Sequence, residues 1–66
     1  MKKQILWYEI GKWTIMEVQY DDTFEYYVRE TVNQYDYFRF VFGSMSRFNE
    51  ENLTALVDSD YFREVD

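Results

Sequence analysis

The side chains of this 66-residue chain that could do chemistry are carboxylates and aromatic rings. The chain carries 13 Asp and Glu residues, two Trp, seven Tyr and six Phe, but no His and no Cys. Histidine is the usual proton shuttle of enzymes, and cysteine supplies the thiolate nucleophile. Aromatic residues in such excess are typical of surfaces that bind another protein. We therefore expect a binding protein and not an enzyme.

The composition also argues against a metal or a cofactor. Zinc sites in proteins are built mainly from Cys and His ligands, and this chain has neither. Asp58 and Asp60 could offer oxygen atoms to a hard cation, but the surrounding residues lack the ligand pattern of a calcium-binding loop. A fold this small is also not expected to form a pocket of the roughly 300 Å³ that small molecules need. We expect no metal, no cofactor and no catalytic residue.

The net charge of −6 limits the partners that the protein can bind directly. Negative charge repels phosphates, so neither nucleic acid nor an anionic membrane surface is an expected ligand. No apolar run approaches the roughly 20 residues of a membrane-spanning helix. The first residues are basic and apolar like a signal peptide, but Glu9 and Lys12 interrupt the apolar stretch, and no small-residue cleavage site follows. We expect a cytoplasmic protein.

The length predicts a single domain over residues 1–66 with marginal stability. A chain of this size buries only about 60% of the surface that it exposes when unfolded. Small folds add disulfides, metals or a partner subunit, and the absence of Cys and His leaves the partner subunit. We therefore expect a homodimer. The alternative is a monomer held together by its large aromatic side chains.

Residues 12–20 alternate with the period of a β-strand. One face is made by the even positions, which are Thr14, Met16, Val18 and Tyr20. The odd positions open with Trp13 and Ile15 but become polar at Glu17 and Gln19. The pattern predicts a strand with one buried face.

Turn-forming residues follow at positions 21–23, and residues 24–30 are rich in β-branched and aromatic side chains. Together with the preceding strand, this run predicts an antiparallel hairpin. Residues 5–10 are also strand-like, and Gly11 after them fits either a bulge or the junction to a loose arm. Residues 1–11 are therefore either an extra strand or an arm.

Residues 33–43 fit two structures. As a strand, their alternate aromatic residues would share one face, made by Phe38, Phe40 and Phe42. As a helix, they would begin at Asn33 as the N-cap, use Asp36 as the capping-box acid and end at Gly43. Such a helix would be apolar over too wide an arc to pack on one sheet alone, so the excess would meet a second subunit or a partner.

The last part of the chain leaves a similar choice. Residues 49–52 could begin a helical turn. Residues 53–58 fit either the continuation of that helix or a third strand.

Several positions occur at a spacing that matches a known family. They are Met16, Gln19, the Asp21-Asp22 turn, the Tyr26-Tyr27 pair, Phe38 and Gly43. Over residues 13–43, without a gap, this order resembles the small acidic uracil-DNA glycosylase inhibitors of Bacillus podoviruses. The resemblance implies a phage-encoded homodimer that acts in the cytoplasm of an infected bacterial host and binds the host uracil-DNA glycosylase.

The resemblance also implies a fold and a mechanism. The family fold is α+β, with a small antiparallel three-stranded sheet packed against one helix in two layers. Two such helices meet in the dimer and form a hydrophobic groove, which takes up the apolar side chain that the glycosylase inserts into DNA during base flipping. Together with the capping pattern, the resemblance predicts a helix over residues 34–42.

The site residues follow from the resemblance and from what a DNA mimic needs, which is an apolar slot with fixed anions beside it. The partner-binding residues would be Tyr35, Phe38, Arg39, Val41 and Phe42, and the phosphate-mimicking acids would be Glu30, Asp36, Glu50 and Glu51. Arg39 stands where the family has an acidic residue, and Phe42 stands where it has a tyrosine. The polar contacts of the groove would therefore differ from those of the family.

Simpler roles and other partners compete with these assignments. Each acid could belong to a solvated surface, and each aromatic residue could belong to the core, Phe40 more than Phe42. We expect Trp7 and Trp13 to be structural. The alternative function is that of an acidic decoy inhibitor or adaptor of another nucleic-acid-binding protein, such as a CRISPR effector, a nuclease or a polymerase. A structural module that oligomerises is a third reading.

Overall fold

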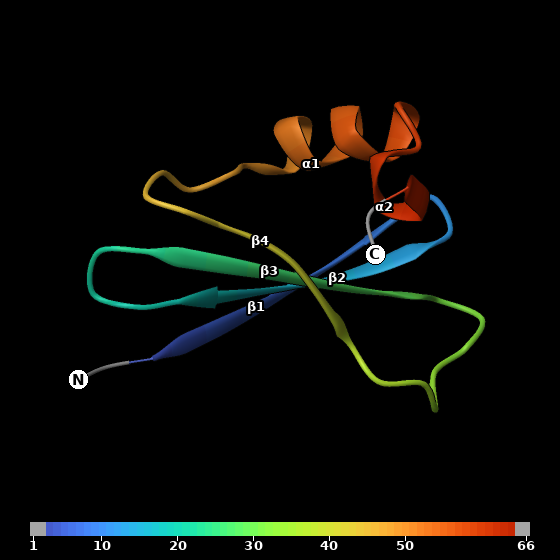
Figure 1. The fold of residues 1–66 in the computed structure, drawn as a ribbon, viewed down its shortest axis with the longest axis horizontal. Helices are drawn as coiled ribbons and strands as arrows, with labels where there is room; N and C mark the ends of the chain where they lie inside the picture. The colour runs from blue at the N-terminus through green and yellow to red at the C-terminus, as the bar shows by residue number, and fades with distance from the viewer. Residues whose placement is uncertain (1–2, 65–66) are drawn as a thin grey trace.

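A computed structural model describes residues 3–64, which form an antiparallel sheet followed by two short helices (Figure 1). The strands are β1 (Gln4–Ile10), β2 (Trp13–Gln19), β3 (Phe24–Glu30) and β4 (Arg39–Ser44), and they lie side by side in chain order. The helices are α1 (Glu50–Asp58) and α2 (Tyr61–Glu64). Both helices lie on the same side of the sheet, so the fold is α+β with two layers.

The first two hairpins follow local signals in the chain. Ile10 lies opposite Trp13, which leaves a two-residue turn that begins with Gly11. Gly11 has a φ of 61°, a conformation that glycine adopts without steric cost. Residues 5–10 therefore belong to a strand and not to a loose arm, and the predicted hairpin of β2 and β3 is confirmed.

The predicted helix over residues 34–42 is wrong. Residues 39–44 form β4, which pairs with β3. The β-rich composition of the segment prevails because β3 offers a free edge whose backbone groups β4 can bond. Asn33 and Asp36 act in the preceding loop, where the Asp36 N–H donates to the Asn33 carbonyl over 2.9 Å. The capping pattern thus marks a turn, because the same short polar side chains favour both structures.

A β-bulge in β4 changes which side chains share a face. Tyr26 lies opposite Phe42, and Tyr27 lies opposite Phe40, so Val41 is an extra residue between them. A bulge of this kind breaks the alternation of sides along the strand. Phe40 therefore lies on one side of the sheet and Phe42 on the other.

Helix α1 begins at an N-cap that the sequence signals. Asn49 is extended, and its side chain accepts a hydrogen bond of 2.8 Å from the Asn52 N–H. Glu50 and Glu51 in the first turn interact favourably with the helix dipole. Residues 53–58 continue this helix, so they do not form a third strand.

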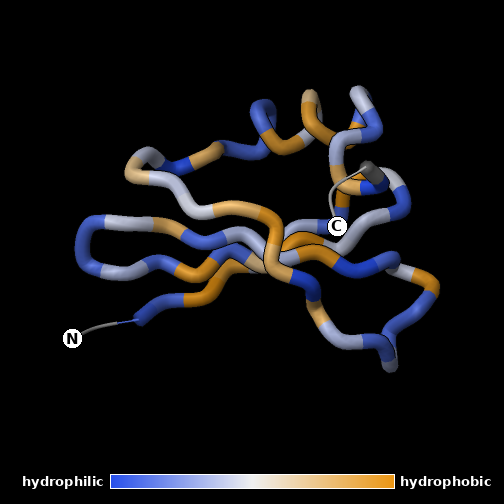
Figure 2. The backbone as a smooth tube through the Cα atoms, viewed as in Figure 1, coloured by the Kyte–Doolittle hydropathy of each residue, from blue (hydrophilic) through white to orange (hydrophobic). Residues whose placement is uncertain are grey.

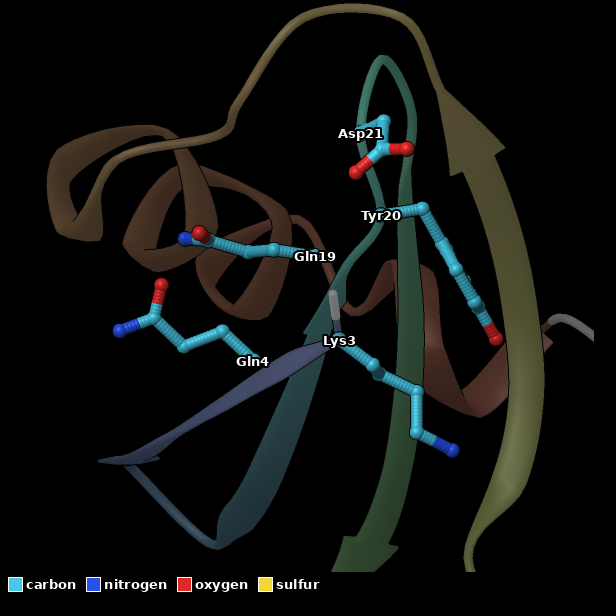
Figure 3. A pocket seen from close by; sticks show the side chains of 5 residues that line it. All are labelled: Lys3, Gln4, Gln19, Tyr20 and Asp21. Carbon is cyan, nitrogen blue, oxygen red and sulfur yellow. The ribbon is translucent and has the colours of Figure 1, made fainter. Parts of the chain in front are cut away.

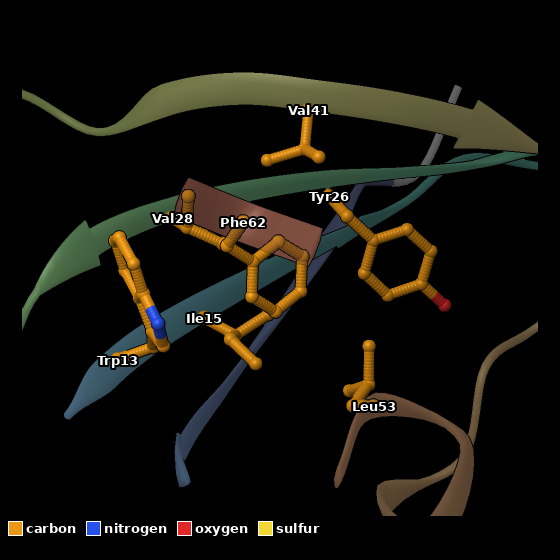
Figure 4. Packing of buried hydrophobic residues seen from close by; sticks show 7 residues of the cluster. All are labelled: Trp13, Ile15, Tyr26, Val28, Val41, Leu53 and Phe62. Atoms are coloured by element: carbon orange, nitrogen blue, oxygen red, sulfur yellow. The ribbon is translucent and has the colours of Figure 1, made fainter. Parts of the chain in front are cut away.

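The core lies between the helices and one face of the sheet (Figure 4). Its buried apolar residues are Trp13, Ile15, Tyr26, Val28, Val41, Leu53 and Phe62. Leu53 comes from α1 and Phe62 from α2, and neither has exposed surface. Burial of a large apolar side chain stabilises a fold by about 1.5–3 kcal/mol. Figure 2 shows hydrophobic residues along the strands and a hydrophilic turn between β2 and β3.

The buried face of β2 is the odd-numbered one, although it contains a carboxylate. Trp13, Ile15 and Glu17 are all buried beneath the helices. On the opposite face Thr14 and Met16 remain partly exposed, whereas Val18 is buried by its neighbours in the sheet. Polar character along a strand therefore does not mark the solvent side here, because the carboxylate finds partners inside the protein.

The predicted three-stranded sheet with one helix is wrong. The described residues form four strands and two helices in an α+β arrangement. The difference arises because β1 adds a strand and because residues 34–42 form no helix. The helix-lined groove that the resemblance implies is therefore not present in residues 3–64. Neither helix of this part of the chain is long and apolar enough to cross a membrane.

Candidate functional site

The sheet face away from the helices carries a row of large side chains, one from each strand. Trp7 lies opposite Met16, Met16 opposite Tyr27, and Tyr27 opposite Phe40. Residues directly opposite each other in an antiparallel sheet point to the same side. Because Ile15, the neighbour of Met16, is buried beneath the helices, this row lies on the other face.

Ring contacts join this row to Phe38, which precedes β4. The Trp7 and Phe38 ring centroids lie 5.3 Å apart, and the Arg29 guanidinium carbon lies 4.3 Å from the Phe38 centroid. The Tyr27 and Phe40 rings meet edge to face with centroids 5.5 Å apart. Such aromatic pairs each contribute about 0.5–1.5 kcal/mol beyond area burial. We call Trp7, Met16, Tyr27, Phe38 and Phe40 the aromatic face.

The aromatic face is only partly covered. Trp7 is 57% exposed and Phe40 is 50% exposed, although both are large and apolar. Ile5, which shares this side of β1 with Trp7, is 41% exposed. Contiguous apolar surface that soluble proteins leave open often marks an interaction site. The face can therefore dock an apolar group of another protein.

Two tyrosines in the loop between β3 and β4 are almost fully exposed. The loop of residues 31–38 projects away from the helices (Figure 1), and it leaves Tyr35 99% exposed and Tyr37 91% exposed. The loop is tied to β3, because the Arg29 Nη1 donates to the Asp36 carbonyl over 3.3 Å. Exposed Tyr on a loop is typical of binding surfaces, since its ring offers a large contact area with few rotatable bonds.

Two carboxylates lie on the same side of the sheet as the aromatic face. Alternation places Glu9 on the side of Trp7, and Glu25 on the side of Tyr27. Glu25 Oε1 accepts hydrogen bonds from the hydroxyls of Tyr27, over 2.9 Å, and Tyr20, over 3.3 Å. The bond to Glu25 raises the pKa of Tyr27, and burial followed by the charge of Glu25 raises the pKa of Tyr20. The two carboxylates are about four residues apart along the strands, or roughly 13 Å.

The structure separates the predicted partner-binding residues. Phe38 lies at the aromatic face and Tyr35 in the loop before it, whereas Val41 and Phe42 belong to the helix-covered side. Arg39 also turns toward the helices, because its Nη2 donates to the carbonyl of Phe62 in α2 over 2.6 Å. These five residues therefore do not line one groove. The bulge and the missing helix send them to both sides of the sheet.

The predicted phosphate-mimicking acids are separated as well. Glu30 ends β3 opposite Trp13, on the helix-covered side, and Asp36 lies in the loop that follows. Glu50 and Glu51 lie in the first turn of α1, which follows the other end of the sheet. A seven-residue strand spans roughly 20 Å, so these four acids do not flank one slot.

Sequence reasoning missed the residues that do share one surface, which are Trp7, Phe40, Glu9 and Glu25. Phe40, which the sequence favours as a core residue, is 50% exposed, and Trp7, which we expect to be structural, is 57% exposed. The signal was present in the alternation of β1 and β3, which places an acid beside an aromatic residue on the same side of each strand. It becomes informative only when strand pairing and the helices show which face is open.

A buried carboxylate forms a second polar cluster on the helix-covered side. Glu17 has no exposed surface, and the Tyr26 hydroxyl donates to its Oε2 over 2.7 Å. The Arg47 Nε lies 3.3 Å from the same oxygen, and the Arg47 Nη2 donates to the Tyr8 hydroxyl over 2.8 Å. The Tyr26 hydroxyl in turn accepts from the Phe48 N–H over 2.7 Å. These contacts hold Arg47 and Phe48, which lie between β4 and α1, against the sheet.

This cluster has the properties of a structural support. Burial, and then the hydrogen bond to Glu17, raises the pKa of Tyr26. The hydrogen bond to Tyr8, and then the charge of Glu17, raises the pKa of Arg47. Both shifts favour the protonated forms of Tyr26 and Arg47, and the Glu17 carboxylate is closed to solvent. The contacts join the sheet to the connection between β4 and α1, as a structural support does.

A hollow of about 440 Å³ lies at one end of the sheet, where β1 begins and β2 ends (Figure 3). Its lining residues are Lys3, Gln4, Gln19, Tyr20 and Asp21. The expectation that no pocket of roughly 300 Å³ forms is therefore wrong. In Figure 3 the two glutamines point toward the side of α1, while Lys3 and Tyr20 point to the opposite side. Because these side chains diverge, they do not converge on one ligand.

Within residues 3–64, no group of three or more Asp and Glu side chains gathers to hold a metal ion.

Comparisons with protein-family models, curated proteins and solved structures find no match to this chain. The geometry alone therefore favours the aromatic face, with Glu9 and Glu25, as the candidate binding surface.

Proposed function

We propose that this protein is a non-catalytic, acidic inhibitor that binds a nucleic-acid-binding enzyme through its aromatic face. The observation that carries the proposal is the half-exposed row that includes Trp7 and Phe40 on the face that no helix covers. Trp and Tyr dominate the binding energy of many protein interfaces, and contiguous exposed apolar surface often marks an interaction site.

The charge supports a target that normally binds nucleic acid. A net charge of −6 complements a basic DNA channel and speeds association with it. Glu25 is held by two tyrosine hydroxyls, so its charge has a fixed position, as a phosphate has in DNA. A mimic of DNA needs fixed anions beside an apolar surface, and the aromatic face with Glu9 and Glu25 supplies that combination.

The resemblance of residues 13–43 makes uracil-DNA glycosylase of the bacterial host the first target of the proposal. A glycosylase that flips bases unstacks DNA while it holds the phosphates in a basic channel. In our proposal, its inserted apolar side chain docks on the aromatic face of the sheet. A nuclease, a polymerase or a CRISPR effector is the second candidate, because the same surface suits other basic channels.

Uracil release from duplex DNA tests the first target. We expect the protein, in modest molar excess over the glycosylase, to abolish release. Trp7→Ala should weaken the inhibition about thirtyfold, the effect of losing an interface hot spot of about 2 kcal/mol. Circular dichroism must first show that the variant remains folded. Undiminished release with the wild-type protein would exclude the glycosylase.

A matched pair of acid variants separates the aromatic face from net charge. Glu25→Gln removes a charge beside the aromatic face and keeps an oxygen for the tyrosine hydroxyls. Glu51→Gln removes the same charge from the first turn of α1. We expect only the first to weaken inhibition, and equal effects would show that net charge drives the binding. Without inhibition, capture from a bacterial lysate with wild-type and Trp7→Ala baits would identify the second candidate.

A further inference from the structure

Strand β1 is a free edge of the sheet. It is the outer strand in the order β1-β2-β3-β4, so one row of its backbone groups has no strand partner within residues 3–64. β4, the other outer strand, contains the bulge at Val41, and bulges protect edges from pairing. β1 pairs with β2 along all of its residues without a register shift. A regular edge of this kind can accept another strand.

The sequence of β1 complements itself in the antiparallel direction. If Leu6 lies opposite Leu6 of a second copy, then Ile5 lies opposite Trp7, and Lys3 lies opposite Glu9. In antiparallel strands, alternate residues direct their N–H and C=O groups toward the same neighbour. This register pairs odd positions with odd positions, so the outward groups of one copy meet the outward groups of the other.

The side chains of β1 match the same register. Ile5 and Trp7 are both exposed on one side of the strand, and an aliphatic and an aromatic residue form a favourable cross-strand pair. Lys3 and Glu9 share that side, are exposed, and form no ion pair with the residues that the structure describes. Opposite charges across two strands attract, whereas equal charges would have kept a second copy away.

We propose that two copies of this chain join along β1 in this register and form a twofold dimer with one continuous eight-stranded antiparallel sheet. The twofold axis passes between the two Leu6 residues, perpendicular to the sheet. Both aromatic faces then lie on the same side of the dimer, and all helices lie on the other. The dimer offers one doubled binding surface, whatever the target of that surface is.

A charge-reversal series tests this register. Lys3→Glu places two carboxylates opposite each other, and Glu9→Lys places two ammonium groups opposite each other, each twice per dimer. Both side chains are exposed, so the fold should persist. At low salt we expect each single variant to raise the dimer dissociation constant about tenfold. The double variant should return it to about the wild-type value, as measured by sedimentation equilibrium.

Lys12→Glu is the matched control, because it makes the same charge change in the turn, outside the paired segment. We expect it to change the dissociation constant by less than about twofold. A wild-type protein that stays monomeric at its highest soluble concentration would overturn the proposal. So would a double variant that fails to recover, since the register requires that recovery.

Hydrogen exchange locates the interface independently of the charges. Amide protection in β1 should rise with protein concentration, while protection in β4 should stay constant. Protection that rises in β4 and not in β1 would place the contact on the other edge and overturn the proposal.

Discussion

The two faces of the sheet contain the same kinds of residue in opposite environments. On the helix-covered face, Tyr26 has no exposed surface, and the Glu17 carboxylate is fully buried. On the aromatic face, Trp7 and Phe40 keep about half of their surface exposed. Acids and aromatic residues occur on both faces, so composition does not separate them. The difference arises because the chain after β4 folds back over one face only.

The same contact, a carboxylate that accepts hydrogen bonds from tyrosine hydroxyls, occurs on both faces, but it is buried on one face and open on the other. Glu17 accepts from Tyr26 and pairs with Arg47 inside the protein. Glu25 also accepts from tyrosine hydroxyls, but it lies on the face that another protein can reach. A carboxylate bonded to tyrosine is therefore a structural support under the helices and a positioned anion on the open face.

Substitutions on the two sides of the sheet test this comparison through the free energy of unfolding. We expect the largest loss on the covered side. Phe62 packs against Trp13 and Tyr61, with ring centroids 6.0 and 5.7 Å away. We expect Phe62→Ala to lower the free energy of unfolding by about 3–5 kcal/mol, because the cavity adds to the lost burial. Urea titration at low temperature measures this loss. A loss below about 1 kcal/mol would mean that α2 does not cover the sheet in solution.

An intermediate effect is expected at the polar cluster of the covered face. Tyr26→Phe removes the hydroxyl that joins Glu17 to the Phe48 N–H. We expect it to lower the free energy of unfolding by about 1–3 kcal/mol, the cost of leaving buried polar groups without a partner. Urea titration at neutral pH measures the loss, and an unchanged midpoint would contradict the burial of this cluster.

The pH dependence of stability gives a second test of the Tyr26→Phe variant. The unfolded Tyr loses its proton near pH 10, whereas burial raises the pKa of Tyr26 in the folded protein. Above about pH 10 the unfolded state therefore binds fewer protons, and stability falls as the pH rises. Below pH 10 the contribution is fully present. We expect the stability of Tyr26→Phe to fall less steeply than that of the wild type above pH 10, and equal slopes would contradict the assignment.

The smallest effect on stability is expected on the aromatic face. Phe40→Ala removes a half-exposed ring and its contact with Tyr27. We expect the free energy of unfolding to fall by about 1 kcal/mol or less, since little buried volume is lost. Thermal unfolding measures this change beside Phe62→Ala. A loss as large as that of Phe62→Ala would show that the face is covered in solution.

Local signals predict part of this fold correctly. The β2–β3 hairpin follows from alternation on both sides of an Asp-rich turn, and α1 begins at the N-cap Asn49. The prediction fails at residues 34–42 because Asn33 and Asp36 suit a turn as well as a helix start. Whether such a segment becomes a strand depends on the free edge of β3, which no local window contains.

The candidate site was harder to predict than the fold. Phe38 lies on the aromatic face, but Phe42 lies on the helix-covered side because of one extra residue in β4. A bulge depends on how two strands fit together and leaves little trace in the sequence of one strand. The face assignment of every later residue in β4 depends on it.

By itself, the sequence determines an acidic chain without His or Cys, rich in aromatic residues, whose alternating segments form strands. Only the tertiary structure decides which face of those strands is covered. It buries Glu17 by bringing Arg47, thirty residues later, to the carboxylate, and it leaves Trp7 and Phe40 open. The physical reason is that burial depends on contacts between segments distant in sequence, whereas alternation fixes only which residues share a side.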